Sequence, residues 1–220
     1  MDERTAPDRA GEPAAPDAAG LKRRAARDRL VRAGLKLSAG RPWARVKVAD
    51  VAGRAGMSKG AFFTHFASKD TFAAYLLGVV LDQLAQRVGP MGLSPEDAED
   101  LVAGVLAVHL RFFQLRPEAA NLIIAARELS GRPGRRARQS LREHLDMVAR
   151  LLRPALAAMD QPPELGRQLA LAGLATGCGL AWLEPWLGGE TALPGTGRER
   201  LARALSVGLN RTERPRRPVP

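Results

Sequence analysis

The side chains with the clearest chemical use lie in the short segment from Lys59 to Phe66. A small hydroxyl at Thr64 can hydrogen-bond a DNA base or a phosphate, and a methyl group at Ala61 can lie against a thymine methyl. The positions expected to face base edges are Lys59, Ala61, Phe62 and Thr64. Groups of this kind on one short helix suit contact with duplex DNA.

Two short helices and a turn would hold these side chains in place. The apolar residues of the first helix recur at three- and four-residue spacing: Val48, Val51, Ala52 and Ala55. Gly56 follows, where a chain leaving a helix favours a left-handed residue. Ser58 can then cap the second helix by accepting an amide proton. This outline is typical of a helix-turn-helix, whose second helix enters the major groove.

The charge of the chain is concentrated on this part of the sequence. The whole chain carries a net charge of +11, and residues 21–70, with thirteen basic and three acidic side chains, contribute +10. Residues 1–20 contribute −3, residues 71–209 are nearly neutral at +1, and the last eleven residues contribute +3. A basic segment that coincides with a predicted helix-turn-helix favours a polyanionic duplex as partner. The alternative is a solvated basic surface.

Other kinds of chemistry find little support. His109 and His144 have no further ligand at metal-binding spacing, so we expect neither a metal nor a cofactor. Cys178 stands among small residues and has no basic neighbour in sequence, which favours packing over redox sensing. Without a nucleophile elbow, a phosphate-binding glycine loop or a zinc motif, we expect no catalytic residues and no enzyme. The chain also lacks a stretch long and apolar enough to span a membrane, and we expect a cytoplasmic protein.

The periodicity of the remaining chain predicts an all-α fold. We expect breaks at 89–92 and 131–134, and a kink or division of the following helix at Pro154. The expected helices are 21–39, 48–55, 59–66, 68–88, 94–115, a helix opening at 117, 135–160, 164–187 and 198–209. The expected organisation is a disordered tail at 1–20, a helix-turn-helix domain at 21–67, a helical domain at 68–209, and a disordered basic tail at 210–220.

The helix-turn-helix segment resembles the DNA-binding domain of the tetracycline-repressor (TetR) family. The residues that carry the resemblance are Val51-Ala52, Ala55-Gly56-Met57-Ser58-Lys59-Gly60, Phe63, His65-Phe66 and Ser68-Lys69-Asp70. The segment departs from the family pattern in having Ser38 for Phe, Lys47 for Thr and Phe63 for Tyr. Lys47 therefore cannot cap its helix with its side chain, but it can still meet a phosphate.

The resemblance implies further DNA contacts and a second, larger functional domain. His65 and Lys69 match positions at which the family contacts phosphates, and Ser58 and Lys47 complete the expected DNA-binding set. The alternatives are an exposed or core histidine for His65 and an ordinary surface lysine for Lys69. The later helices would form a homodimer and bind a small-molecule effector.

We expect an effector cavity between about Leu101 and Trp186. Its residues combine an apolar lining with a few polar groups: His109, Phe112, Phe113, Glu128, His144, Met147 and Trp182. This mixture suits an amphipathic or aromatic small molecule. The alternative is a closed helical core, which would have the same composition.

We expect the dimer seam on the last two helices. Gly173 and Gly177 lie four residues apart and would let a partner helix approach closely, while Leu201 and Leu205 would supply an apolar ridge. The alternative is that both glycines face the core of their own subunit.

The leading functional hypothesis is a dimeric regulator that binds operator DNA, most simply a repressor released by an effector. The alternative is a DNA-binding regulator without small-molecule input, controlled by its abundance or by a protein partner. An enzyme with a DNA-binding appendage is a third, weaker hypothesis.

Overall fold

The computed structural model describes residues 18–90, 98–183, 200 and 202–203. In this part of the chain every regular element is helical and no strand occurs, which confirms the all-α prediction. The elements are α1 (Ala18–Gly40), η1 (Trp43–Arg45), α2 (Val48–Arg54), α3 (Lys59–His65), α4 (Lys69–Val88), α5 (Ala98–Leu115), α6 (Pro117–Ala126), α7 (Gly131–Ala158) and α8 (Leu165–Leu183). None of the described helices meets the length and hydropathy that a bilayer span requires.

The turn between α2 and α3 forms as the local sequence predicts. Gly56 adopts φ +66°, the left-handed region that glycine enters without steric cost. Ser58 caps α3, and its Oγ accepts a hydrogen bond from the Ala61 amide at 3.1 Å. At the start of α2, the Asp50 carboxylate accepts from the Lys47 amide at 3.4 Å and pairs with Arg41 at 2.5 Å. A lysine side chain has no acceptor, so Asp50 alone supports this end through its side chain.

An aromatic cluster joins the helix-turn-helix to α4. The Phe72 ring lies 5.2 Å from the Phe62 ring and 4.6 Å from the Phe66 ring, between centroids. On α1, a Cβ built at Gly34 would lie 2.7 Å from Phe72 Cζ, so only glycine permits this approach of α1 to α4. The first turn of α4 therefore belongs to the core of the DNA-binding end, although the proposed domain boundary places α4 in the second domain.

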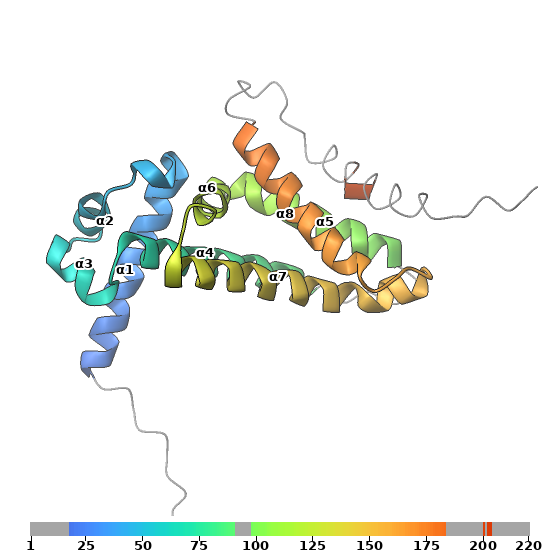
Figure 1. The fold of residues 1–220 in the computed structure, drawn as a ribbon, viewed down its shortest axis with the longest axis horizontal. Coiled ribbons are helices and arrows are strands. Elements are labelled where there is room, and N and C mark those ends of the chain that lie inside the picture. Colours follow the sequence, from blue (N-terminus) through green and yellow to red (C-terminus); the bar gives the residue numbers. More distant parts are fainter. Residues whose placement is uncertain (1–17, 91–97, 184–199, 201, 204–220) are drawn as a thin grey trace, which may run out of the picture.

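The larger helical part is built around two pairs of helices. Figure 1 shows α1–α3 at one end of the molecule, with α4 and α7 running side by side away from them. The helices α5 and α8 pack on each other and cover α7, while α6 lies between α1 and the larger part. The α6 helix thus connects the DNA-binding end to the remaining helices.

Three expectations about helix limits are corrected. The chain is already helical at Ala18, so residues 18–20 are not a disordered tail. The expected break at 131–134 is instead the first turn of α7, where a proline is tolerated because its missing N–H is not needed. α7 then continues through Pro154 to Ala158, so the expected division does not occur, and the alternative of a kink at Pro154 stays a prediction. Most of the expected helix at 198–209, with Leu201 and Leu205, lies outside the described residues.

Candidate nucleic-acid interface

The second helix of the helix-turn-helix, α3, presents a polar face to solvent. Lys59 and Thr64 are exposed, and Ala61 is half-buried between them. The Thr64 Oγ1 donates a hydrogen bond to the Ala61 carbonyl at 2.7 Å, which holds the hydroxyl on the helix surface. Ala61 and Thr64 lie three residues apart and share one side of α3, whereas Lys59 is exposed at the first turn of the helix. Their contact with DNA remains a prediction.

Phe62 does not belong to this face. Its side chain is fully buried against Phe66 and Phe72, because a residue and the fourth residue after it share one helix face. Its neighbour Phe63 is 45% exposed, so it stands where DNA-facing aromatic contact is possible. The expectation that Phe62 faces base edges is therefore corrected. A helix of seven residues carries too short an apolar pattern to distinguish the two phenylalanines.

Lys69 is turned inward at the start of α4. Its Nζ donates to the Ala44 carbonyl at 3.1 Å and lies 5.5 Å from the centroid of the Trp43 ring. Desolvation lowers the pKa of Lys69, and the neighbouring Asp70 carboxylate partly opposes this effect. In this arrangement the ammonium group is held beside Trp43, so contact with a phosphate requires the side chain to change rotamer.

The other predicted phosphate contacts remain at the surface. Lys47 is exposed at the N-terminus of α2, and Ser58 is exposed at that of α3, with its hydroxyl engaged in capping. His65 is half-buried in the last turn of α3. None of these positions conflicts with phosphate contact, and the role of each remains a prediction.

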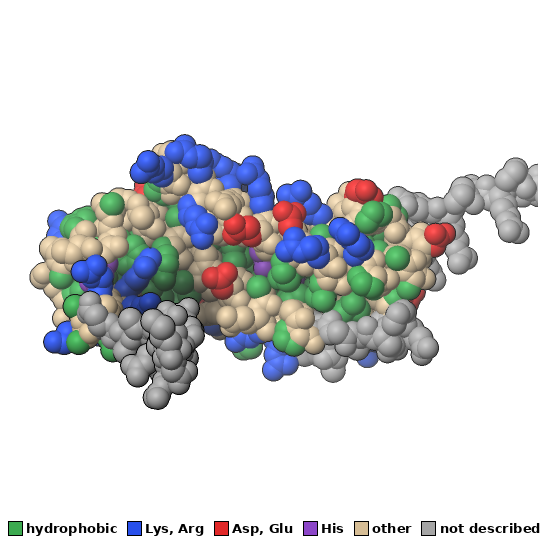
Figure 2. Space-filling view, turned by 90° about the horizontal axis from the view of Figure 1, so that it is seen from below, with side chains coloured by type: hydrophobic (Ala, Val, Ile, Leu, Met, Phe, Trp, Pro, Cys, Tyr) green, Lys and Arg blue, Asp and Glu red, His purple; other side chains and the backbone are tan. Residues whose placement is uncertain are grey.

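A basic hollow on α1 and α2 was not singled out from the sequence. It has a volume of about 320 Å³ and is lined by Arg29, Arg32, Lys36 and Arg54. The first three recur at three- and four-residue spacing, so they share one helix face, and this spacing is the signal that could have identified them. Figure 2 shows blue Lys and Arg side chains from the left part of the molecule, where α1–α3 lie, to the right of its centre.

Comparison with known proteins agrees with this geometry. Residues 30–76 match the family model described as bacterial regulatory proteins, tetR family. The DNA-binding segment therefore belongs to the TetR family. Within it, an uncharacterized HTH-type transcriptional regulator, YwcC of Bacillus subtilis strain 168, is 46% identical over 57 residues. That match covers 26% of this chain and 26% of the relative, so it concerns the DNA-binding part alone.

Solved structures extend the similarity to most of the TetR-family fold. A transcriptional regulator from Rhodococcus sp. Rha1 is 26% identical with a TM-score of 0.64, over 83% of this chain and 94% of that one. The regulator FadR from Bacillus subtilis, solved in complex with stearoyl-CoA, has a TM-score of 0.65 over 82% of this chain and 97% of its own. At 15% identity, the likeness to FadR concerns the fold alone.

The predicted effector residues do not converge on one cavity. His109 and His144 form a buried pair between α5 and α7, with their Nε2 atoms 3.1 Å apart. Phe113 is fully buried beside them, as part of a closed core. Burial lowers the pKa of both histidines, that of His144 to about 3, and so favours the uncharged form of each ring.

The other four predicted effector residues lie elsewhere. Phe112 is buried beneath the guanidinium groups of Arg87 and Arg116, and Met147 is half-buried on α7. Glu128 and Trp182 line a separate groove beside Trp43. The expectation of one cavity lined by all seven residues is therefore corrected. Among the described residues, no group of three or more His, Cys, Asp or Glu side chains could hold a metal ion.

The glycines of α8 face their own subunit. A Cβ at Gly177 would lie 2.5 Å from Phe113 Cδ2, and one at Gly173 would lie 3.0 Å from His109 Cγ. Both glycines let α8 approach α5, which is the alternative stated above, and their assignment to a dimer seam is corrected. Cys178 is also partly buried, and desolvation raises its pKa to about 12, which disfavours the reactive thiolate.

Proposed function

We propose that this TetR-family protein is a dimeric, sequence-specific DNA-binding transcriptional regulator, and that it acts as a repressor released by a small molecule. The observation that carries the DNA-binding part is the exposure of Lys59 and Thr64 on α3, the second helix of the helix-turn-helix. Lys47 on α2 and the basic α1 surface add positive charge at the same end of the molecule. Exposed polar side chains between cations on a helix-turn-helix suit base contacts between phosphate contacts.

The experiment is to select a duplex from random DNA with the full-length protein and to measure its affinity at several salt concentrations. Lys47→Ala and Lys59→Ala should each weaken binding and reduce the slope of log K against log salt by about one for each phosphate that the variant no longer neutralises. Arg138→Ala removes an exposed cation from α7 and serves as the matched control. Unchanged affinity and slope in both lysine variants would refute the assignment.

We assign the dimer seam to the exposed face of α8. Leu171 is 56% exposed, and Ala175 and Gly179 follow it at four-residue spacing on the same face. A Cβ at Gly179 would meet nothing within 4 Å, so this glycine is open to a partner helix. A row of apolar and small residues suits close helix packing across a two-fold axis. Such a dimer would place two α3 helices at half-sites about 34–36 Å apart, or a multiple of that distance.

Support for the effector comes from the fold and from one structural neighbour. FadR from Bacillus subtilis was solved in complex with stearoyl-CoA, so a protein of this fold binds an amphipathic ligand. We propose that this chain also responds to a small molecule that favours one arrangement of the dimer. Such a molecule lowers the affinity of the protein for DNA only to the extent that it binds one arrangement of the dimer more tightly than the other.

The second candidate function is regulation without a small molecule. It is favoured by the closed packing of Phe113, His109 and His144, which are at most 4% exposed in the region where we expected a cavity. Thermal denaturation in the presence of a metabolite library separates the two candidates, because a ligand of the folded state raises stability by mass action.

A further inference from the structure

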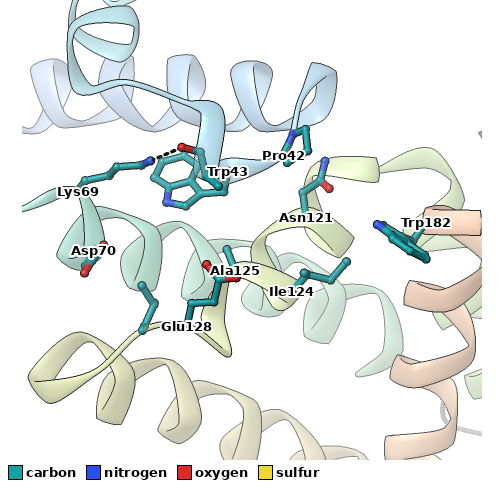
Figure 3. Close-up of a pocket in the computed structure, with 11 residues that line it drawn as sticks. Pro42, Trp43, Lys69, Asp70, Asn121, Ile124, Ala125, Glu128 and Trp182 are labelled. Atoms are coloured by element: carbon teal, nitrogen blue, oxygen red, sulfur yellow. Dashed lines mark hydrogen bonds between the residues drawn. The ribbon is translucent and has the colours of Figure 1, made fainter.

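A groove separates the DNA-binding end from the larger helical part. It has a volume of about 300 Å³ and is bounded by Trp43 and Lys69 on one side and by Asn121, Glu128 and Trp182 on the other. Figure 3 shows these side chains around one open space, with residues from η1 and α4 facing residues from α6 and α8. We refer to it as the Trp43 groove. Its volume lies at the lower end of the range for small-molecule sites.

Two hydrogen-bond donors stand on the Trp43 side of this groove. The Lys69 ammonium group donates one of its three protons to the Ala44 carbonyl, which leaves two for other acceptors. The Trp43 residue is only 5% exposed, and its Nε1 has no hydrogen-bond partner. Buried indole N–H groups normally have a partner, so this one marks a place where an acceptor is missing.

The opposite side of the Trp43 groove supplies acceptors and apolar surface. The Glu128 carboxylate accepts hydrogen bonds only, and so does that of Asp70, which stands next to Lys69 on α4; both side chains are exposed. Trp182 and Ile124 are 59% and 39% exposed, so they offer an aromatic and an aliphatic wall to a bound molecule. A bound molecule that covers these side chains removes apolar surface from water, which favours binding.

We propose that the Trp43 groove binds an uncharged, flat aromatic molecule that carries both a carbonyl and a hydroxyl group. The carbonyl oxygen accepts from Trp43 and Lys69, the hydroxyl donates to Glu128 or Asp70, and the ring lies against Trp182. The mixed charge of the lining argues against an ion. Asp70 and Glu128 repel an anion, and Lys69 repels a cation.

Occupation of the Trp43 groove would act on DNA binding through Lys69. A carbonyl that accepts from the ammonium group keeps it beside Trp43 and away from a phosphate. The same molecule also bridges η1 and α4 to α6, and so it stiffens the junction between the two parts of the chain. This consequence for DNA rests on the proposed function, whereas binding in the groove does not.

The test uses 7-hydroxycoumarin as the probe and isothermal titration calorimetry on the full-length protein. Coumarin lacks the hydroxyl and 2-naphthol lacks the carbonyl, so each should bind about tenfold more weakly because one set of groove groups is left unpaired. Glu128→Gln and Trp43→Phe should each weaken 7-hydroxycoumarin binding by a similar factor. Glu164→Gln, an exposed carboxylate change outside the groove, and Leu115→Ala, an exposed apolar truncation on α5, are the controls and should bind as the wild type does.

Two results would overturn the proposal. One is the absence of 7-hydroxycoumarin binding at a dissociation constant below about 1 mM. The other is binding that is equal in the wild type, Glu128→Gln and Trp43→Phe, which would place the molecule elsewhere. Glu128→Gln keeps the result interpretable if Trp43→Phe fails to fold, because Glu128 is exposed.

A separate titration with the selected DNA duplex keeps this proposal distinct from the proposed function. If the unliganded protein binds DNA and 7-hydroxycoumarin does not bind the protein, only the groove proposal fails. If 7-hydroxycoumarin binds in the groove but the protein binds no DNA, the groove proposal stands and the proposed function fails.

Discussion

Acid should destabilise this protein through the buried histidine pair before most carboxylates titrate. The Val105 carbonyl can only accept, so the His109 Nδ1 at 2.8 Å from it carries a proton. The His109 Nε2 then accepts from the His144 Nε2–H at 3.1 Å, which leaves the His144 Nδ1 as a buried acceptor without a partner. A further proton on this uncharged pair would be buried beside the other ring.

The size of the effect follows from the pKa of His144. Its pKa falls from 6.5 to about 3 on folding, chiefly because burial disfavours the charged form and secondarily because of His109. Below pH 6.5 His144 therefore binds a proton in the unfolded chain but not in the folded chain, so the free energy of unfolding decreases as the pH falls. Each pH unit between these two pKa values costs about 1.4 kcal/mol, so His144 alone should cost about 2 kcal/mol between pH 6.5 and 5. The lowered pKa of His109 acts in the same direction.

Urea denaturation followed by circular dichroism measures this dependence at a fixed protein concentration. His144→Gln keeps a polar side chain but does not titrate, so the free energy of unfolding of this variant should change less between pH 6.5 and 5. Ser140→Ala, a buried change one turn earlier on α7, is the control and should keep the wild-type slope whatever its effect on stability. Equal pH slopes in the wild type and His144→Gln would refute this account of the pair.

Three further variants test the packing described above. Gly177→Ala should lower the free energy of unfolding by about 1–3 kcal/mol through overpacking against α5. Gly53→Ala, an exposed change within α2 with nothing within 4 Å, should not destabilise, and equal thermal melts of the two variants would contradict this contrast. Phe62→Ala should lower the free energy of unfolding, measured by urea denaturation, by about 3–5 kcal/mol because the Phe62 side chain is fully buried. Phe63→Ala should lower it much less because Phe63 is exposed. The reverse order would place Phe62 on the exposed face of α3. Leu171→Glu should shift the protein toward monomer in sedimentation with helical content unchanged, and a persistent dimer would place the seam elsewhere.

Local signals in the sequence were sufficient for the helix-turn-helix. The turn at Gly56 depends only on the backbone conformation of that residue, and the helix cap at Ser58 depends only on an amide three residues away. Because both effects act within one turn, the order of helices and the α2–α3 turn could be predicted without knowledge of any partner. The same holds for the all-α class, which follows from periodicity along each helix.

Local signals failed where the burial of a long helix decided the outcome. The motif at 131–134 has the composition of a break, yet it forms the first turn of α7, in which Gly134 is buried. Pro154 likewise stays within α7, whose residues Val148 and Leu152 are fully buried against other helices. Packing of an amphipathic face outweighs local propensity in such cases.

By itself, the sequence determined which segments are helical at the DNA-binding end, where the positive charge lies, and which family the segment resembles. Only the tertiary structure decided that Phe62 is buried, that Gly177 faces its own subunit, and that Trp43 and Trp182 border one groove. The physical reason is the range of the interactions. Capping and periodicity act over three or four residues, whereas the neighbour of a helix face is chosen by packing between residues far apart in the chain.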